Sequence, residues 1–589
     1  ISTPPFRDQV ESLRTRIFQG ASRIELGFTG AGKGNLAQGS TTPEQYGREE
    51  REAIRHLAKL NDVQLSTHAT FGIGGLSGFN SEEGGFSKNA AEHALHEIER
   101  AIDFAADTAK GGPIVLHAQE FPRPIYKVKP EGVKGEFEGF PGEKEQGIVY
   151  FADERTGKIK GFKKDMPIAI PGKIDRENYE IKYGERDPET GKIPFTVMNY
   201  GEYIEFLRGK AKKEGKEINP ELEAMKESEI REIERNKGEM ERYDSIVRRE
   251  EDQIKQLDGL KSSYEKSLDA AHDKDFIKAT FRERIMRDEG LRELRPKTRD
   301  EFKEFTDNPE KFLEKHIKEI KSSMESYKEG VLGYGRSVEI AKRELENLRP
   351  IEEVGVKRSA ETIARAAIFA YDKERTEKLE KPLFVAPENL FDTSYGSDPR
   401  ELRKIIETSR ERMTEKLVEE RRMNKEQAHK IAEEHIKATF DIGHLNTWRK
   451  YFKGSNEEFN KWVLKEVEDL QEKKIIGHIH LSDNFGYYDE HVSPGYGNAP
   501  VSEFVEKLKK LGYKGTMIVE PGHQDSRAWT EAMRNLHSPI YRSKSWTEIE
   551  SGYFGKSYNP PYVVGGYAPD VSLGDEHRDW KFWSGVSIE

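Results

Sequence analysis

Imidazole and carboxylate side chains are concentrated in one short stretch of this chain, "HIHLSDNFGYYDEHVSPGYG" (478–497). It holds His478, His480, Asp489 and His491. A solvated loop seldom needs three imidazoles, whereas a divalent metal ion is commonly bound by side chains of these types. The chain has no cysteine, so thiolate ligands and disulfides are excluded and any metal must bind His, Asp or Glu.

Short apolar runs alternate with helical patterns in two separate parts of the chain. Such alternation predicts parallel strands joined by crossover helices. The predicted strands are 23–28, 63–68, 113–119, 382–391, 438–444, 475–481 and 515–522. A parallel barrel needs eight strands. We therefore expect a strand upstream of Ile1 to be missing or reduced to a stub, unless a strand from the insertion or the tail closes the barrel.

The predicted fold class is α/β: a TIM (β/α)8-type barrel with a long, largely helical, coiled-coil-like insertion and an irregular C-terminal tail. In residues 201–350, apolar positions recur at three- and four-residue steps, which predicts two amphipathic helices pairing as a hairpin. The expected domains are 1–120 (first part of the barrel), 121–200 (loops and hairpins), 201–350 (charged helical hairpin), 351–539 (second part of the barrel) and 540–589 (tail packing on the barrel).

Residues with metal-ligand side chains stand where the predicted strands end or in the loops that follow. They are His68, His117, Glu388, Asp441, His444, His480, Asp489, His491 and Glu520. A single such residue is a weak signal, because a polar residue at a strand end is more often simply hydrogen-bonded. In a parallel barrel, however, all C-terminal strand ends meet on one face. Their joint occurrence predicts a metal site, with zinc favoured and manganese as the alternative.

The motifs around these residues resemble the xylose-isomerase-like TIM-barrel superfamily, and the pattern is closest to the endonuclease IV family (apurinic/apyrimidinic endonuclease family 2). They are "HATFGIG", "VLHAQ", "PENL", "FDIGH", "HIHLSDN", "DEHVSPGYG" and "IVEPG". The resemblance implies up to three metal ions. His68 and His117 would hold the first, with Glu388 bridging to the second; Asp441, His480 and Glu520 would complete the second; His444, Asp489 and His491 would hold the third.

The resemblance also implies a function. A metal-activated hydroxide would cleave a nucleic-acid phosphodiester, for example at an abasic site, with Glu388 and Glu520 as the catalytic carboxylates. No side-chain nucleophile is required, which agrees with the absence of cysteine and of a GxSxG motif. The expected partner is then nucleic acid. Because the net charge is −11, its surface must be a local patch, for which 123–129 and 158–164 are candidates.

Two alternative functions stay open. A sugar or sugar-phosphate isomerase or epimerase would use only Glu388, Asp441, His480 and Glu520, in a one- or two-metal site, with its two glutamates moving protons on a small phosphorylated sugar. A proton shuttle does not require the four histidines at 68, 117, 444 and 491, so their presence favours the phosphodiesterase. A scaffold would instead use the helical insertion to bind a protein or another copy of the chain.

Further expectations concern single residues and location. His478 is expected in the core or behind the metal ligands, and Asp483 and Asn484 could orient ligands or contact substrate. His523 and the glycine-rich loop 29–43 are candidates for substrate contact. No apolar stretch is long enough for a membrane span and no signal peptide is visible, so we expect a cytoplasmic protein without membrane contact.

Overall fold

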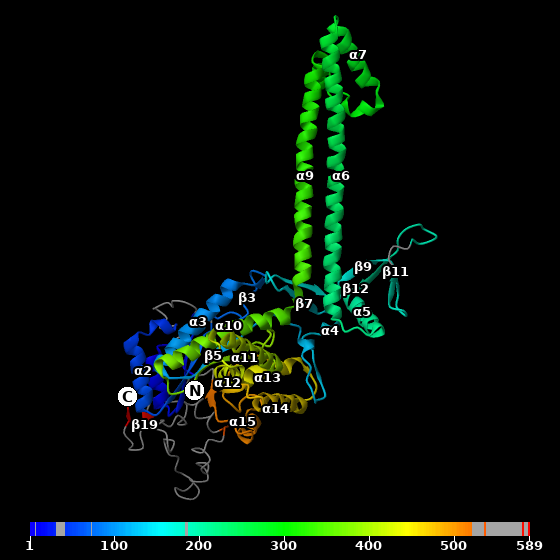
Figure 1. The fold of residues 1–589 in the computed structure, drawn as a ribbon. Helices are drawn as coiled ribbons and strands as arrows, with labels where there is room; N and C mark the ends of the chain where they lie inside the picture. Colours follow the sequence, from blue (N-terminus) through cyan, green and yellow to red (C-terminus); the bar gives the residue numbers. More distant parts are fainter. Residues whose placement is uncertain are drawn as a thin grey trace. The chain divides into compact units, whose positions relative to one another are not determined.

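The computed structural model shows two compact units, residues 1–216 with 349–589 and residues 217–348 (Figure 1). The residues it describes are 1–5, 7–30, 42–71, 73–182, 186–520, 535–536, 580–581 and 587–588. The expectation of a tail packed on the barrel therefore lies almost wholly outside the described residues. Only the short antiparallel pair β19 (Trp580–Lys581) and β20 (Ser587–Ile588) is described there.

The first unit is built around a parallel sheet of seven strands. In sheet order these are β1 (Arg23–Phe28), β2 (Gln64–Thr70), β5 (Gly112–Ala118), β14 (Leu383–Asn389), β15 (Ala438–Asp441), β17 (Ile476–Leu481) and β18 (Thr516–Val519). Most of their residues are buried, as expected for parallel strands covered by helices. This arrangement confirms the predicted TIM-type barrel.

The first three residues lie between the two edge strands of this sheet. The amide of Ser2 donates to the carbonyl of Val519 on β18 (3.1 Å), and the amide of Thr3 donates to the carbonyl of Glu25 on β1 (2.8 Å). The amide of Glu25 in turn donates to the carbonyl of Ile1 (3.0 Å). Among the described residues, the eighth position of the barrel is thus filled by a stub of extended chain.

Helices follow the strands around the barrel. They are α1 (Gln9–Phe18), α2 (Arg48–Leu60), α3 (Lys88–Thr108), α10 (Ile351–Glu377), α11 (Pro399–Arg421), α12 (Lys425–His435), α14 (Asn456–Glu472) and α15 (Val501–Lys510). The start of α11 shows how side chains fix the end of a helix. Asp398 accepts hydrogen bonds from the amides of Arg400 and Glu401, and Pro399 occupies the first helical position, where its missing N–H costs nothing.

One predicted strand ends earlier than the sequence suggests. Residues 438–444 were expected to be extended throughout, but β15 stops at Asp441 and His444 lies in a short helix, α13 (Ile442–Asn446). The cause is local, because the side chain of Asp441 accepts a hydrogen bond from the amide of His444 (2.8 Å) and so caps this helix. His444 is therefore presented from a helical turn above the strand end.

Between β5 and β14 the chain first forms small antiparallel pairs. These are β7 (Ile148–Asp153) with β8 (Ile159–Lys163), β9 (Pro167–Pro171) with β12 (Phe195–Asn199), and β10 (Lys173–Asp175) with β11 (Glu180–Lys182). The basic stretch 123–129 is largely neutralised. Arg123 is buried against Trp448 and pairs with Glu401 (2.7 Å), and Lys127 pairs with Glu352 (3.2 Å).

The second unit is a helical hairpin. Its long arms are α6 (Pro220–Ala270) and α9 (Pro309–Asn347), which pack side by side, with α7 (Lys274–Arg287) and α8 (Arg299–Asp307) between them in the chain (Figure 1). Each arm begins with a capping asparagine followed by proline. Among the described residues, no helix is long and apolar enough to cross a membrane.

The hairpin is held by a narrow apolar seam, and a second, smaller cluster of Ile233, Val338 and Ala341 also joins α6 to α9. Leu257 and Tyr264 on α6 belong to the same buried cluster as Phe312, Leu313 and Ile317 on α9. The outer faces carry ion pairs at helical spacing, including Arg248 with Asp244, and Lys261 on α6 pairs across the hairpin with Glu314 on α9 (2.6 Å). This charged exterior accounts for part of the unusually high content of charged residues, 35%.

Shortening a seam residue should loosen the hairpin and leave the barrel unchanged. Leu313 is fully buried, so Leu313→Ala should destabilise the hairpin by about 2–5 kcal/mol. Hydrogen exchange of the α6 and α9 amides would measure the effect, with the exposed Lys321→Ala as the matched control. Equal exchange in both variants would contradict the seam.

Candidate metal centre

The barrel brings all nine residues singled out in the sequence to one end. His68, His117 and Glu388 lie near the C-terminal ends of β2, β5 and β14, Asp441 and His480 lie near those of β15 and β17, and Glu520 directly follows β18. Register reinforces the convergence, because Glu388 is paired with His117 and Asp441 with His480 on neighbouring strands. Partners in a parallel register point to the same side of the sheet.

These residues separate into three groups whose ligand atoms lie within 4.8 Å of one another. The first cluster is His68, His117 and Glu388; the central cluster is Glu388, Asp441, His480 and Glu520; the outer cluster is His444, Asp489 and His491. Two ligand atoms that each lie about 2.1 Å from the same zinc ion are only slightly closer to each other than the atoms of these groups. Glu388 belongs to two clusters, and no other residue among those described does so within these three sets.

The two oxygens of Glu388 face different partners. Its Oε2 lies 3.6 Å from His68 Nε2 and 3.9 Å from His117 Nε2. Its Oε1 lies 2.8 Å from His480 Nδ1 and 3.5 Å from His444 Nδ1. One carboxylate therefore reaches the first cluster through one oxygen and the central cluster through the other, which is the arrangement a bridging ligand needs.

The donor sets fit divalent metal ions. Oε2 of Glu388 and Oδ2 of Asp441 are buried and have no hydrogen-bond partner among the described residues. A buried carboxylate oxygen without a partner is costly unless a cation is supplied. Mixed imidazole and carboxylate donors suit zinc, and manganese where carboxylates dominate. Bound there, such ions would polarise a phosphoryl or carbonyl oxygen and lower the pKa of a water.

Exposure increases from the centre to the outer cluster. Glu388, Asp441 and His480 are completely buried, whereas the side chains of Asp489 and His491 are 28% and 24% exposed. His444 Nε2 lies 3.3 Å from Asp489, and His491 Nε2 lies 3.0 Å from the same carboxylate. A substrate would therefore meet the outer cluster first.

In the metal-free protein, the imidazoles of His480 and His491 favour the protonated form. Burial opposes charge on His480, but Glu388, Glu520 and Glu25 outweigh it and raise its pKa well above the usual range. Burial likewise opposes charge on His491, yet its hydrogen bond to Asp489 raises its pKa to about 9. His117 behaves oppositely, since burial and the neighbouring His68 lower its pKa to about 3. Metal binding must displace the protons of the first two imidazoles.

The loop that carries the outer cluster is tied down by Asp483. This buried carboxylate accepts hydrogen bonds from the amides of Asn484, Gly495, Gly497 and Ala499, at 2.8–3.0 Å. A side chain at Gly497 would collide with the carbonyl of Asn484 and with Asp483 itself, which explains the glycine. Asp483 therefore fixes the shape of the loop that carries Asp489 and His491.

The backbone of His491, in this loop, is strained. His491 has a φ of 50°, a left-handed conformation that a residue with a Cβ adopts at some cost. Its Nδ1 lies 3.0 Å from the carbonyl of Glu520, which holds the ring in place. Positive φ at a residue with these contacts is typical of a functional position.

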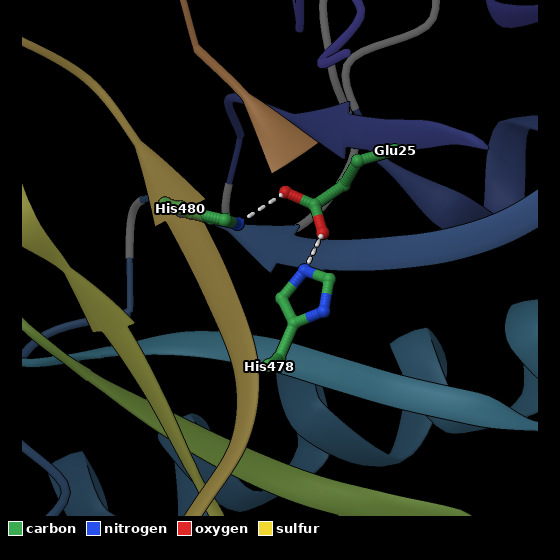
Figure 2. A group of neighbouring side chains, drawn as sticks. All are labelled: Glu25, His478 and His480. Carbon is green, nitrogen blue, oxygen red and sulfur yellow. Dashed lines mark hydrogen bonds and ion pairs between the residues drawn. The ribbon is translucent and has the colours of Figure 1, made fainter. Parts of the chain in front are cut away.

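One residue of the site was not identified from the sequence. Glu25, in the middle of β1, is 1% exposed and lies 2.8 Å from His480 Nε2 and 3.0 Å from His478 Nε2 (Figure 2). The available signal was a carboxylate inside the otherwise apolar run "RIELGF". His478 lies behind His480 in the core, as expected. His523 and most of the loop 29–43 lie outside the described residues.

Metal affinity should depend on pH with a definite sign. A zinc-bound imidazole nitrogen carries no proton, and His491 keeps its proton up to about pH 9. Affinity should therefore rise from about pH 6 to about pH 9 and level off above, with proton release on binding. Chelator competition at several pH values, with calorimetry in buffers of different ionisation enthalpy, would measure this. A flat profile would contradict it.

Removing the anchor of the loop should weaken the outer cluster selectively. Asp483→Asn loses the charge that holds four backbone amides, so the affinity for one metal equivalent should fall by about tenfold or more while the others persist. Zinc titration at limiting metal is the measurement. The exposed Asp165→Asn is the matched control, and equal behaviour of both variants would refute the role of Asp483.

Comparison with known proteins agrees with this barrel. A family model described as "Xylose isomerase-like TIM barrel" matches residues 416–538. The uncharacterized protein MJ1311 of Methanocaldococcus jannaschii is 43% identical over 91 residues, which are 15% of this chain and 27% of that protein. The chain thus matches about a quarter of the length of this relative.

Solved structures of sugar epimerases also share similarity. The 3-keto-D-glucoside 4-epimerase YcjR of E. coli is 10% identical with a TM-score of 0.35, covering 91% of this chain and 97% of its own. A D-tagatose 3-epimerase-like protein is 23% identical with a TM-score of 0.22, covering 37% and 72%. Such scores transfer no function, and they do not single out the endonuclease IV family. The family match and the seven parallel strands together support a xylose isomerase-like TIM barrel for this chain.

Proposed function

We propose that this chain is a metal-dependent hydrolase that cleaves phosphodiester bonds, with nucleic acid as its substrate class. The observation that carries the proposal is the grouping of nine candidate ligands into three neighbouring sets, two of which share Glu388. Closely spaced divalent ions stabilise both the attacking and the leaving oxygen of an in-line displacement at phosphorus. A site of this composition would also need no nucleophilic side chain.

The residues of the centre would have different roles according to their position. Glu388, fully buried, would hold the first and central clusters in fixed relation. The Glu520 side chain is 15% exposed and lies 3.4 Å from His480 Nδ1, and burial raises its pKa. A carboxyl group with a raised pKa beside the opening can take up or return a proton during the displacement. Asp489 and His491 would meet the substrate at the mouth.

Exposed aromatic side chains next to the centre support a nucleic-acid substrate. Phe485, Tyr487 and Tyr488, each more than half exposed, precede Asp489 in the same loop. Phe71 is 39% exposed and its ring stacks against the imidazole of His117 at 5.1 Å. Bases stack on exposed aromatic rings without sequence preference, and a small phosphorylated sugar would use fewer of them.

Hydrolysis should depend on metal and on the outer cluster. Zinc-loaded protein should cleave a duplex oligonucleotide carrying one abasic site, and chelation should abolish cleavage. His491→Ala should lower the rate by at least about 100-fold, because it removes a ligand from the substrate-facing cluster. His429→Ala, on the exposed face of α12, is the matched control. A fully metallated wild type without cleavage of abasic or intact DNA would refute the proposal.

A sugar isomerase or epimerase is the second candidate, favoured by one specific observation. The central cluster alone contains two glutamates and two further ligands, the set that a one-metal proton shuttle would need. For this function the outer cluster is dispensable. If His491→Ala retained exchange of substrate hydrogen with deuterated solvent on a phosphorylated ketose, and DNA remained intact, the isomerase would replace the hydrolase. A scaffold without catalysis would require none of these ligands.

A further inference from the structure

Glu25 is a charged residue where the barrel interior should be apolar. It lies in β1, is 1% exposed, and belongs to none of the three metal clusters described above. A carboxylate buried this deeply is stable only when donors replace its hydration. The role of Glu25 can therefore be inferred from the groups that contact its carboxylate.

Three donors surround this carboxylate. The hydroxyl of Ser66 donates to its Oε2 at 2.8 Å, and His478 Nε2 lies 3.0 Å from the same oxygen. His480 Nε2 lies 2.8 Å from the other oxygen, Oε1 (Figure 2). Both Oε1 and His480 Nε2 are buried, and neither forms an aligned hydrogen bond with any described residue, so their 2.8 Å contact is a close ion pair.

The two nitrogens of His480 face opposite surroundings. Nδ1 lies 2.8 Å from Glu388 and 3.4 Å from Glu520, which are members of the central cluster. Nε2 faces Glu25 alone. Since a neutral imidazole has one protonated and one free nitrogen, the acceptor that holds the Nε2 proton leaves the Nδ1 lone pair free for a metal.

We propose that Glu25 is a positioning residue that fixes the proton of His480 on Nε2, so that His480 binds the central metal ion through Nδ1. This rests on the metal centre proposed above. Glu25 itself makes no contact with the metal or the substrate. Carboxylates behind a metal-bound histidine act in this way by setting its tautomer, its orientation and its basicity.

His478 completes the arrangement from behind. It is fully buried, its Nδ1 has no hydrogen-bond partner among the described residues, and its Nε2 faces Glu25. A neutral imidazole with its proton on Nε2 satisfies this geometry. The ligand atoms of Glu25, His478 and His480 lie within 4.8 Å of one another, as in the three clusters above. Only three ligands are present there and all are sealed from solvent, so hydrogen bonding is the better account.

The test is the metal affinity of Glu25→Gln, measured by chelator competition, with the metal content at saturation measured by elemental analysis. The glutamine amide keeps one acceptor but turns its other atom into a donor, so it cannot accept from both histidines. Affinity for one equivalent should fall by about 10- to 100-fold, while the saturating metal content stays that of the wild type. Ser66→Ala removes a donor to the same carboxylate without touching His480 and should change affinity little.

Controls separate positioning from mere stability. Glu143→Gln is the matched control, because Glu143 is another buried carboxylate that accepts three backbone hydrogen bonds, far along the chain from these strands. The rise in melting temperature on adding zinc should be smaller in Glu25→Gln than in Glu143→Gln, whereas a purely structural role would lower both metal-free and metal-loaded melting temperatures equally. If Glu25→Gln fails to fold, Glu25→Asp, which keeps the charge, is measured in its place and should show the same loss in weaker form.

Each outcome is decisive. Unchanged affinity in Glu25→Gln would overturn the positioning role. Loss of a whole equivalent even at saturating zinc would overturn it as well, because Glu25 would then be a ligand. These results are independent of hydrolysis. A wild type that binds no zinc would defeat the proposed metal centre, and a zinc-loaded wild type that cleaves no DNA would defeat only the proposed substrate.

Discussion

A carboxylate fully buried at the centre of the barrel is the constraint on which the site depends. Glu388 is completely buried, and four imidazoles face its two oxygens. Burial opposes its charge, but the neighbouring His480 and the other imidazoles outweigh that and hold its pKa well below the usual range. Positive charge must therefore be present in this interior, as protons on the imidazoles or as metal ions in their place.

Closure of the barrel maintains that constraint. The ligands come from β2, β5, β14, β15 and β17, and from segments that follow β15, β17 and β18. They share one end only because parallel strands in a closed ring all point the same way. Backbone hydrogen bonds of Ser2 and Thr3 complete the ring between β18 and β1. Glu25 on β1 reaches His480 only because these edges are joined.

The insertion leaves this geometry intact because of where it enters. β5 and β14 flank it in the chain yet pair in register along seven residues, from Gly112 with Leu383 to Ala118 with Asn389. His117 and Glu388 are one of these pairs. A long insertion between two adjacent parallel strands is tolerated because the connection between such strands already runs outside the sheet. Lengthening that connection also adds little to the entropic cost of bringing the strands together.

The sequence by itself determined which residue types end which strands. Alternating apolar runs and helical patterns predicted the barrel and the helical insertion, and the absence of cysteine restricted any metal to imidazole and carboxylate ligands. The nine candidate ligands were recognised as His, Asp and Glu residues at the ends of predicted strands or in the loops that follow them. These features are local, so they can be recognised without knowing what each residue contacts.

Only the tertiary structure decided the rest. It placed His444 on a helical turn capped by Asp441, made Asp483 the anchor of the outer loop, and set Glu25 against His478, a residue 453 positions away in the chain. Pairings of this kind depend on strand register and barrel closure, which are properties of the whole ring. A polar residue inside a strand looks the same in sequence whether it faces a helix, a neighbouring strand or an imidazole across the barrel.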